Sequence, residues 1–133
     1  MAKRGKNNLD WVSTLLRIPL GLMFVIIGLI KIQDPSGIAG FLGSMGFPIS
    51  MFFAYLMFLT EIIFGLSILI GYKVKYTVWP LVALLFFAVI LVIIPSTQFN
   101  PASIAVLGMH ILSITSLLAI YILGPGKWAI SKD

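Results

Sequence analysis

Four ionisable side chains lie within, or at the edge of, long apolar stretches of this sequence. They are Arg17, Lys31, Glu61 and His110. A charge inside an apolar medium is costly, so each of them is a candidate functional residue. A carboxyl group can exchange a proton or bind a ligand, and a lysine can attract an anion. We therefore take Glu61 and Arg17 as candidate catalytic residues, and Lys31 and His110 as candidate substrate-binding residues.

The depths of these residues predict an ion pair between Glu61 and Arg17. At about 1.5 Å per residue along a helix, Glu61 lies near the centre of its apolar stretch and Arg17 lies roughly 7 Å from the centre of its own. An ionised carboxylate alone in hydrocarbon would be very costly, and the arginine side chain is long enough to reach it. Two alternatives stay open: Arg17 extends to the lipid head groups, or Glu61 makes a purely structural hydrogen bond between helices.

The other two residues also have structural alternatives. Lys31 can pair with Asp34, three residues later, as an anchor at the edge of the membrane. His110 can make a hydrogen bond to a serine of another helix. The chain has no cysteine and one histidine, which leaves too few ligands for a zinc or copper site, so we expect no metal.

The composition identifies the medium in which these residues act. Of the 133 residues, 60% are apolar and only 10% are charged, whereas a soluble domain carries roughly 25% charged residues. Mean hydropathy is +1.12. This excludes a water-soluble protein and predicts one domain, residues 1–133, embedded in a lipid bilayer. The nine basic residues are too dispersed for a nucleic-acid partner.

Four apolar stretches are long enough to span a bilayer as helices, because about 20 residues suffice. They cover residues 11–32, 48–70, 76–94 and 101–123. Asn100-Pro101 is typical of a helix start, and Gly71 and Gly124 are typical of helix ends. Asp34-Pro35 begins an amphipathic segment that ends at Gly46. The prediction is an all-α fold, a four-transmembrane-helix bundle with a short amphipathic interfacial helix between spans one and two.

Charge and small residues predict the orientation and the packing of this bundle. Seven basic residues lie on the side of the two termini and one, Lys31, lies on the other: the seven are Lys3, Arg4, Lys6, Lys73, Lys75, Lys127 and Lys132. This asymmetry predicts a multi-pass protein of the cell membrane with both termini in the cytoplasm. Gly21 and Gly28 share one helical face with Arg17 and Lys31, so we expect that face to contact another helix closely.

The order and spacing of these residues resemble the DoxX/DoxD-like family of membrane proteins. The resemblance rests on Arg17-x-x-x-Gly21, Phe24, Gly28-x-x-Lys31, Gly46-Phe47-Pro48, Glu61-x-x-x-Gly65, Gly71 and the segment Gly124-Pro125-Gly126-Lys127-Trp128-Ala129-Ile130-Ser131. It covers nearly the whole chain. Family members often have a histidine near the end of span three, where this chain reads Ile94-Pro95-Ser96-Thr97-Gln98-Phe99.

The resemblance implies a four-helix membrane protein associated with redox chemistry, since some family members are the membrane subunit of a thiosulfate:quinone oxidoreductase. It implies a quinone as the molecule bound, no cofactor within the chain, and protein subunits of a membrane redox complex as partners. Glu61 would exchange protons or bind a quinone carbonyl, with Arg17 as its counter-ion. The alternatives are an assembly subunit without a site of its own and a small proton-coupled carrier.

Overall fold

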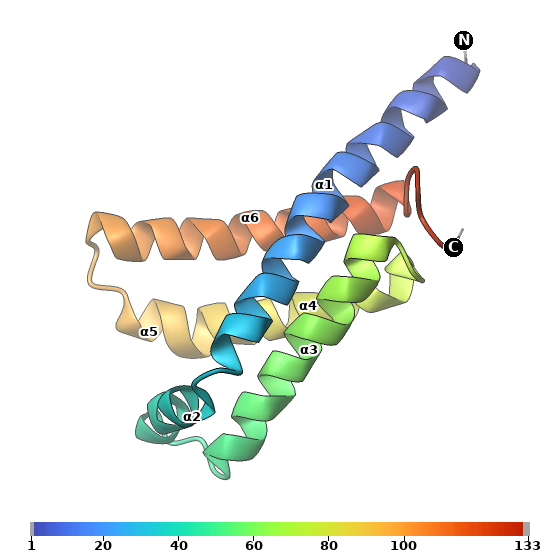
Figure 1. Cartoon of the computed structure of the whole chain (residues 1–133). Coiled ribbons are helices and arrows are strands. Elements are labelled where there is room, and N and C mark those ends of the chain that lie inside the picture. The colour runs from blue at the N-terminus through green and yellow to red at the C-terminus, as the bar shows by residue number, and fades with distance from the viewer. Residues whose placement is uncertain (1, 132–133) are drawn as a thin grey trace.

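The chain folds into helices alone within residues 2–131, which the computed structural model describes, with side chains described from Asn8 onward. The elements, shown in Figure 1, are α1 (Ala2–Lys31), α2 (Pro35–Ser44), α3 (Ser50–Ile70), α4 (Val74–Ala88), the π-helical turn η1 (Val89–Ile93), α5 (Ile94–Ser96) and α6 (Pro101–Leu123). The predicted all-α fold is therefore confirmed. Lys132, one of the seven basic residues, lies outside the described part of the chain.

Four stretches of helix are long and apolar enough to cross a membrane. They are Asn8–Lys31, Ser50–Ile70, Val74–Ser96 and Pro101–Leu123. These stretches match the four predicted spans, with boundaries shifted by no more than three residues. Both ends of the chain lie at one end of the bundle, which we call the terminal end, and α2 lies at the other, the α2 end (Figure 1).

The helix boundaries arise from the capping residues that the sequence provides. The Asp34 carboxylate accepts a hydrogen bond of 3.0 Å from the Gly37 amide at the start of α2. The Asn100 side chain accepts one of 2.8 Å from the Ser103 amide at the start of α6. Gly71 ends α3 with a φ of +72°, a conformation that glycine adopts without strain. The predicted short helix between spans one and two is thus present.

The third span contains a π-helical turn that the sequence analysis did not predict. Pro95 has no amide hydrogen for the Leu91 carbonyl, and its ring crowds that carbonyl in a regular helix. The chain widens instead, and the Ile94 amide donates to the Val89 carbonyl five residues earlier. The Thr97 hydroxyl donates to a carbonyl of the same turn at 2.6 Å. The span therefore continues through the proline to Ser96.

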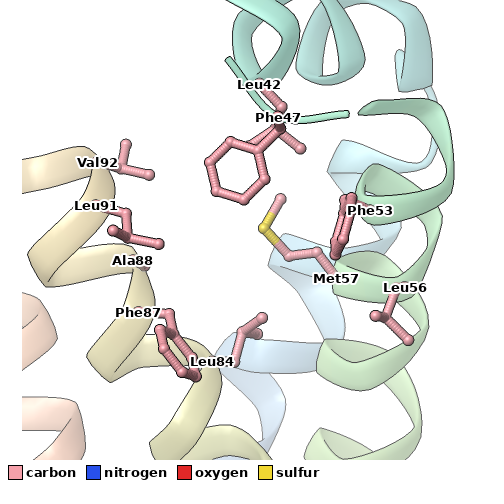
Figure 2. Close-up of a pocket in the computed structure, with 10 residues that line it drawn as sticks. All are labelled: Leu42, Phe47, Phe53, Leu56, Met57, Leu84, Phe87, Ala88, Leu91 and Val92. Atoms are coloured by element: carbon pink, nitrogen blue, oxygen red, sulfur yellow. The ribbon is translucent and has the colours of Figure 1, made fainter. Parts of the chain in front are cut away.

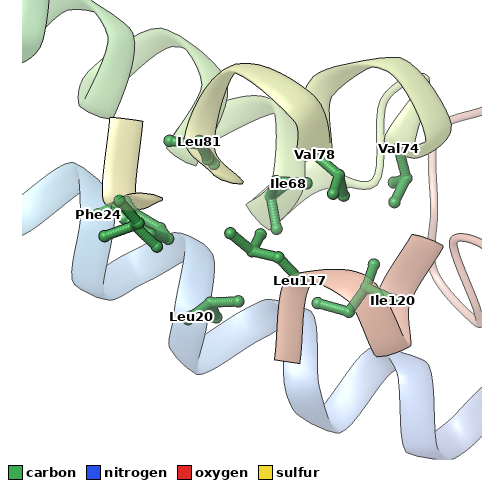
Figure 3. Close-up of a cluster of buried hydrophobic side chains, with 9 residues drawn as sticks. Leu20, Phe24, Ile68, Val74, Val78, Leu81, Leu117 and Ile120 are labelled. Atoms are coloured by element: carbon green, nitrogen blue, oxygen red, sulfur yellow. The ribbon is translucent and has the colours of Figure 1, made fainter. Parts of the chain in front are cut away.

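The main core lies toward the terminal end of the bundle, where all four spans meet (Figure 3). Its buried side chains are Leu20, Phe24, Ile68, Val74, Val78, Leu81, Leu85, Leu117 and Ile120. A second, smaller cluster joins α2 to the first half of α3 through Ala39, Leu42, Ala54 and Phe58. The short helix α2 is thus packed on α3 by its apolar face.

Helices α1 and α3 pack closely because glycine stands at their crossing points. A Cβ atom on Gly21 would lie 2.6 Å from the Leu69 amide nitrogen, and one on Gly65 would lie 2.7 Å from the Phe24 Cβ atom. A Cβ atom on Gly28 would lie 2.6 Å from the Ile62 side chain. The prediction that Gly21 and Gly28 face another helix is confirmed.

Candidate functional site

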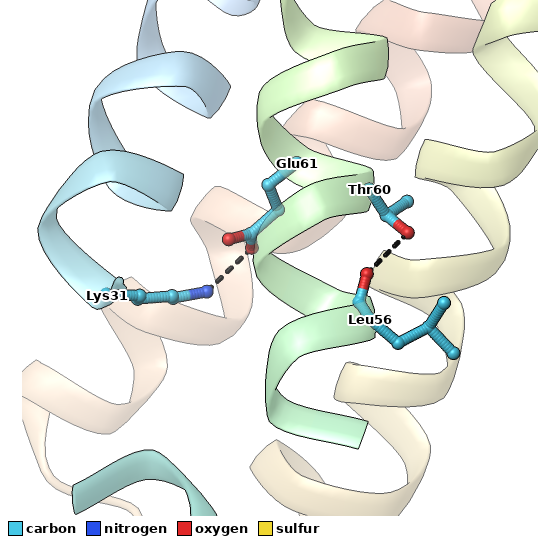
Figure 4. A network of polar contacts seen from close by, with 4 residues as sticks. All are labelled: Lys31, Leu56, Thr60 and Glu61. Carbon is cyan, nitrogen blue, oxygen red and sulfur yellow. Dashed lines mark hydrogen bonds and ion pairs between the residues drawn. The ribbon is translucent and has the colours of Figure 1, made fainter. Parts of the chain in front are cut away.

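The buried carboxylate of Glu61 is paired with Lys31, in the middle of α3 and at the last residue of α1. The Lys31 ammonium group donates to Glu61 Oε1 at 2.6 Å (Figure 4). The Glu61 side chain is 6% exposed and that of Lys31 is 26% exposed. The pair therefore lies inside the interface of two helices, open to its surroundings on the lysine side.

The direction in which helical side chains tilt explains this pairing. Cα–Cβ bonds lean toward the N-terminus of their own helix. The backbone of Gly28 faces Glu61, since a Cβ atom there would lie 3.3 Å from the Glu61 Cβ atom. Lys31 is one turn further along α1 and leans back toward Glu61. Because α3 runs the opposite way, Glu61 leans toward Lys31.

The second carboxylate oxygen of Glu61 is buried and has no hydrogen-bond partner among the described residues. Buried polar atoms are nearly always paired in proteins, so an unpaired one indicates strain, chemistry or a missing ligand. This oxygen is the strongest single indication of a binding site in the described part of the chain.

His110 lies in the first half of α6. Its Nδ1 atom is 2.8 Å from the carbonyl oxygen of Val106, one turn earlier in the same helix. A carbonyl only accepts hydrogen bonds, so Nδ1 carries the proton in this contact. The structure thus shows a bond from His110 within its own helix, in place of the alternative bond to a serine of another helix.

Arg17 is not the partner of Glu61, and the predicted ion pair between them is wrong. The Arg17 side chain is 1% exposed. Its nitrogen atoms donate to the carbonyl oxygens of Pro125 at 2.8 Å, Lys127 at 2.6 Å and Leu69. The same tilt toward the N-terminus of α1 directs Arg17 to the terminal end, away from Glu61. The alternative in which Arg17 extends to the lipid head groups is also wrong, because backbone carbonyls enclose its guanidinium group.

The residues after α6 form a segment that binds to residues 10–17 of α1 and to the C-terminal end of α3, which we call the C-terminal strap (124–131). Thr14 donates to the Lys127 carbonyl at 2.9 Å, and Ser13 donates to the Gly124 carbonyl. The Ile130 amide donates to the Ile70 carbonyl at 3.1 Å. The Gly-Pro-Gly motif is visible in the sequence, but no local pattern predicts that the carbonyls of Pro125 and Lys127 accept hydrogen bonds from Arg17.

The Asp34 carboxylate accepts hydrogen bonds at the start of α2 and does not pair with Lys31. It accepts from the Gly37 amide at 3.0 Å and from the Ser36 hydroxyl at 3.1 Å. The alternative of a Lys31–Asp34 anchor is therefore wrong. Lys31 turns inward to Glu61, which makes the lysine part of the buried site.

An apolar cavity of about 440 Å³ lies between α3 and the third span, beside α2 (Figure 2). This volume falls within the range of about 300–1,000 Å³ that is typical of small-molecule sites. The ten lining residues are all apolar: Leu42, Phe47, Phe53, Leu56, Met57, Leu84, Phe87, Ala88, Leu91 and Val92. Met57 precedes Glu61 by one helical turn along α3, while Glu61 and Lys31 are not among the residues that line the cavity.

A comparison with models of protein families identifies the family of the chain. A family model described as DoxX matches residues 12–94. The chain belongs to the DoxX family. No curated protein and no solved structure matched the chain.

The match to the DoxX model includes most of the candidate site. Arg17, Lys31 and Glu61 lie inside residues 12–94, as do all ten residues that line the cavity. His110 and the C-terminal strap lie after the matched region. As a DoxX protein with four membrane-spanning helices, the chain is a multi-pass membrane protein. Within the described residues, no group of three or more His, Asp and Glu side chains is close enough to hold a metal ion.

Proposed function

We propose that this DoxX protein is the quinone-interacting membrane subunit of a larger redox complex, with Glu61 as its proton-exchanging or carbonyl-binding group. The observation that carries this proposal is the buried Glu61 oxygen without a partner. A quinone offers carbonyl groups on a flat ring and dissolves in the bilayer, which is where this oxygen lies.

The chemistry that the quinone supplies when bound is the uptake of two electrons and two protons, and the electrons would come from a redox group of a partner subunit. Glu61, at mid-depth in the membrane, holds a proton at Oε2 or releases it there. Lys31 keeps Oε1 in place through its hydrogen bond of 2.6 Å. Its other two ammonium hydrogens can donate to a ligand carbonyl.

His110 on α6 would serve as a further ligand-binding group, accepting a hydrogen bond from the reduced ligand. Its Nε2 lone pair is free for a ligand hydroxyl because Nδ1 is bound to Val106. Arg17 has no direct part in this proposal, since its donors are bound to backbone carbonyls at the terminal end. We assign it to holding the C-terminal strap.

Equilibrium binding of decylubiquinone to the protein in lipid nanodiscs tests the proposal. Glu61→Leu removes both carboxylate oxygens, and we expect at least about tenfold weaker binding, the value of one hydrogen bond to a charged group. The matched control is Thr60→Val, because Thr60 is the adjacent residue and its hydroxyl bonds only to Leu56 of its own helix (Figure 4). Equal affinity in the two variants would contradict the proposal.

A variant without either charge keeps this test open if Glu61→Leu alone does not fold. The double variant Glu61→Leu, Lys31→Met replaces the buried pair with apolar side chains of similar size, which is often tolerated. It should fold and still fail to bind decylubiquinone.

A second candidate is an assembly subunit in which the pair only fixes the register of α1 against α3. The burial of the Glu61 side chain, 6% exposed, favours it. In that case the double variant would assemble with its partners and leave quinone binding to other subunits.

A further inference from the structure

The cavity between α3 and the third span has the apolar lining of a site for a hydrocarbon chain. Its walls come from three parts of the protein: α3 on one side, α4 and η1 on the other, and α2 with the loop after it at the α2 end (Figure 2). Leu42 and Phe47 line the cavity at that end.

The open side of the cavity faces the lipid. Leu56, Phe87 and Leu91 line it and are 49%, 58% and 43% exposed. All three lie within spans, so their exposed surfaces face the hydrocarbon of the bilayer. A molecule dissolved in the membrane can therefore enter sideways between α3 and the third span.

The π-helical turn supplies part of the wall. Leu91 and Val92 belong to η1, and Ala88 directly precedes it. A π turn costs stability relative to a regular helix and is frequent at functional sites. Here the widened turn and the small side chain of Ala88 leave room opposite Met57, where a regular helix with a larger residue would leave less.

We propose that this cavity binds the first part of the isoprenoid chain of a membrane quinone whose ring is held at Glu61 and Lys31. This inference rests on the proposed function and adds the site of the chain. Three observations support the choice of occupant: the ten apolar lining residues, the lateral opening to lipid, and the position of Met57 one turn from Glu61. An isoprenoid chain carries methyl branches. Such a branched chain fills a cavity lined by three phenylalanines better than a linear chain does.

Two substitutions of alanine on the same helix test the inference. Ala88→Phe fills the cavity, whereas Ala83→Phe adds the same ring at an exposed position of α4 outside the lining residues. Binding in nanodiscs is compared for two quinones with the same ring, ubiquinone-0 without a chain and ubiquinone-2 with two isoprene units. Since filling a pocket typically changes affinity by 10-fold or more, we expect Ala88→Phe to weaken ubiquinone-2 binding about tenfold and ubiquinone-0 binding little. Ala83→Phe should change neither.

The outcomes separate this inference from the proposed function. If both alanine variants bind ubiquinone-2 alike, the chain does not occupy the cavity, and a lipid tail fills it instead. If Glu61→Leu leaves ubiquinone-0 binding unchanged, the ring site itself is wrong. Ala88→Leu, a smaller change, should give an intermediate loss and keeps the test available if the phenylalanine variant does not fold. A ubiquinone analogue with a diazirine on its chain should label peptide 84–92 in the wild type, and labelling elsewhere alone would overturn the inference.

Discussion

Lys31 and Glu61 form a 2.6 Å ion pair across the interface of α1 and α3, although Lys31 is the last residue of its helix and Glu61 lies in the middle of its own. The pair forms because the two side chains lean toward each other from antiparallel helices. It gives the bundle a buried polar group in the middle of α3, with one carboxylate oxygen that has no hydrogen-bond partner among the described residues. Its energetic role and its chemical role can be separated by experiment.

Removal of one partner should cost more stability than removal of both. Glu61→Leu leaves the Lys31 charge without its counter-ion, and breaking a buried pair in this way costs about 3–5 kcal/mol. We expect the lower end of that range, because Lys31 is 26% exposed. The double variant Glu61→Leu, Lys31→Met should recover most of the loss. Unfolding of the three proteins in mixed micelles measures this, and a double variant less stable than Glu61→Leu would contradict it.

Alanine at two glycines should have opposite effects on stability. At Gly21 the new Cβ atom would lie 2.6 Å from a backbone nitrogen of α3, so the helices must separate, at a cost of about 1–3 kcal/mol. Gly108, in the middle of α6, has nothing within 4 Å of that position. There alanine should be neutral or stabilise the helix by up to about 1 kcal/mol. Thermal unfolding in one detergent compares the two variants, and equal effects would mean that α1 and α3 do not meet at Gly21.

Arg17→Lys should loosen the C-terminal strap without affecting the proposed ligand site at Glu61. Lysine keeps the charge but cannot bond to three carbonyls in the geometry that the guanidinium group spans. Each lost bond from a charged donor contributes about 1.5–3 kcal/mol, so tryptic cleavage after Lys127 should be at least about tenfold faster. Decylubiquinone affinity should stay at the wild-type value. A loss of decylubiquinone affinity with an unchanged rate of cleavage would instead support the prediction that Arg17 is a catalytic residue.

The topology predicted from basic residues places both termini in the cytoplasm. The structure puts the two ends of the chain at one end of the bundle (Figure 1), and the charge asymmetry chooses the side. A reporter that fluoresces only in the cytoplasm, fused after Asp133, should be fluorescent. The same reporter inserted after Gln98, in the loop before α6, is the control and should be dark. A dark fusion after Asp133 and a fluorescent insertion after Gln98 would show that the orientation in the membrane is the opposite of the predicted one.

Hydropathy and local signals were sufficient to predict the elements of this fold. Each span needs only its length and its apolar content, and the caps at Asp34 and Asn100 are encoded within a few residues. The close contact of Gly21 and Gly28 with another helix also follows from their spacing on one face. The π turn was missed because Pro95 at the end of an apolar stretch is compatible with a helix that simply stops.

The partners of the charged residues were harder to predict. The depth of a residue within its span does not tell toward which end of the bundle its side chain leans. Arg17 and Glu61 are within reach in depth, yet their side chains lean to opposite ends of the bundle. The tilt of side chains toward the N-terminus was the available signal for Lys31 with Glu61. No local pattern predicts that Arg17 binds Pro125 and Lys127, because those carbonyls belong to an irregular segment more than 100 residues away.

Infrared difference spectroscopy on glutamate tests the central claim most directly. Glu61 is the only glutamate in the sequence, so labelling with ¹³C-glutamate marks one side chain of the purified protein. If Glu61 exchanges protons with the quinone or binds its carbonyl, reduction of bound decylubiquinone should shift the labelled carboxyl bands, and Glu61→Gln should abolish the signal. Labelled bands that stay unchanged while the bound quinone is fully reduced would contradict the assignment of Glu61 as the functional group.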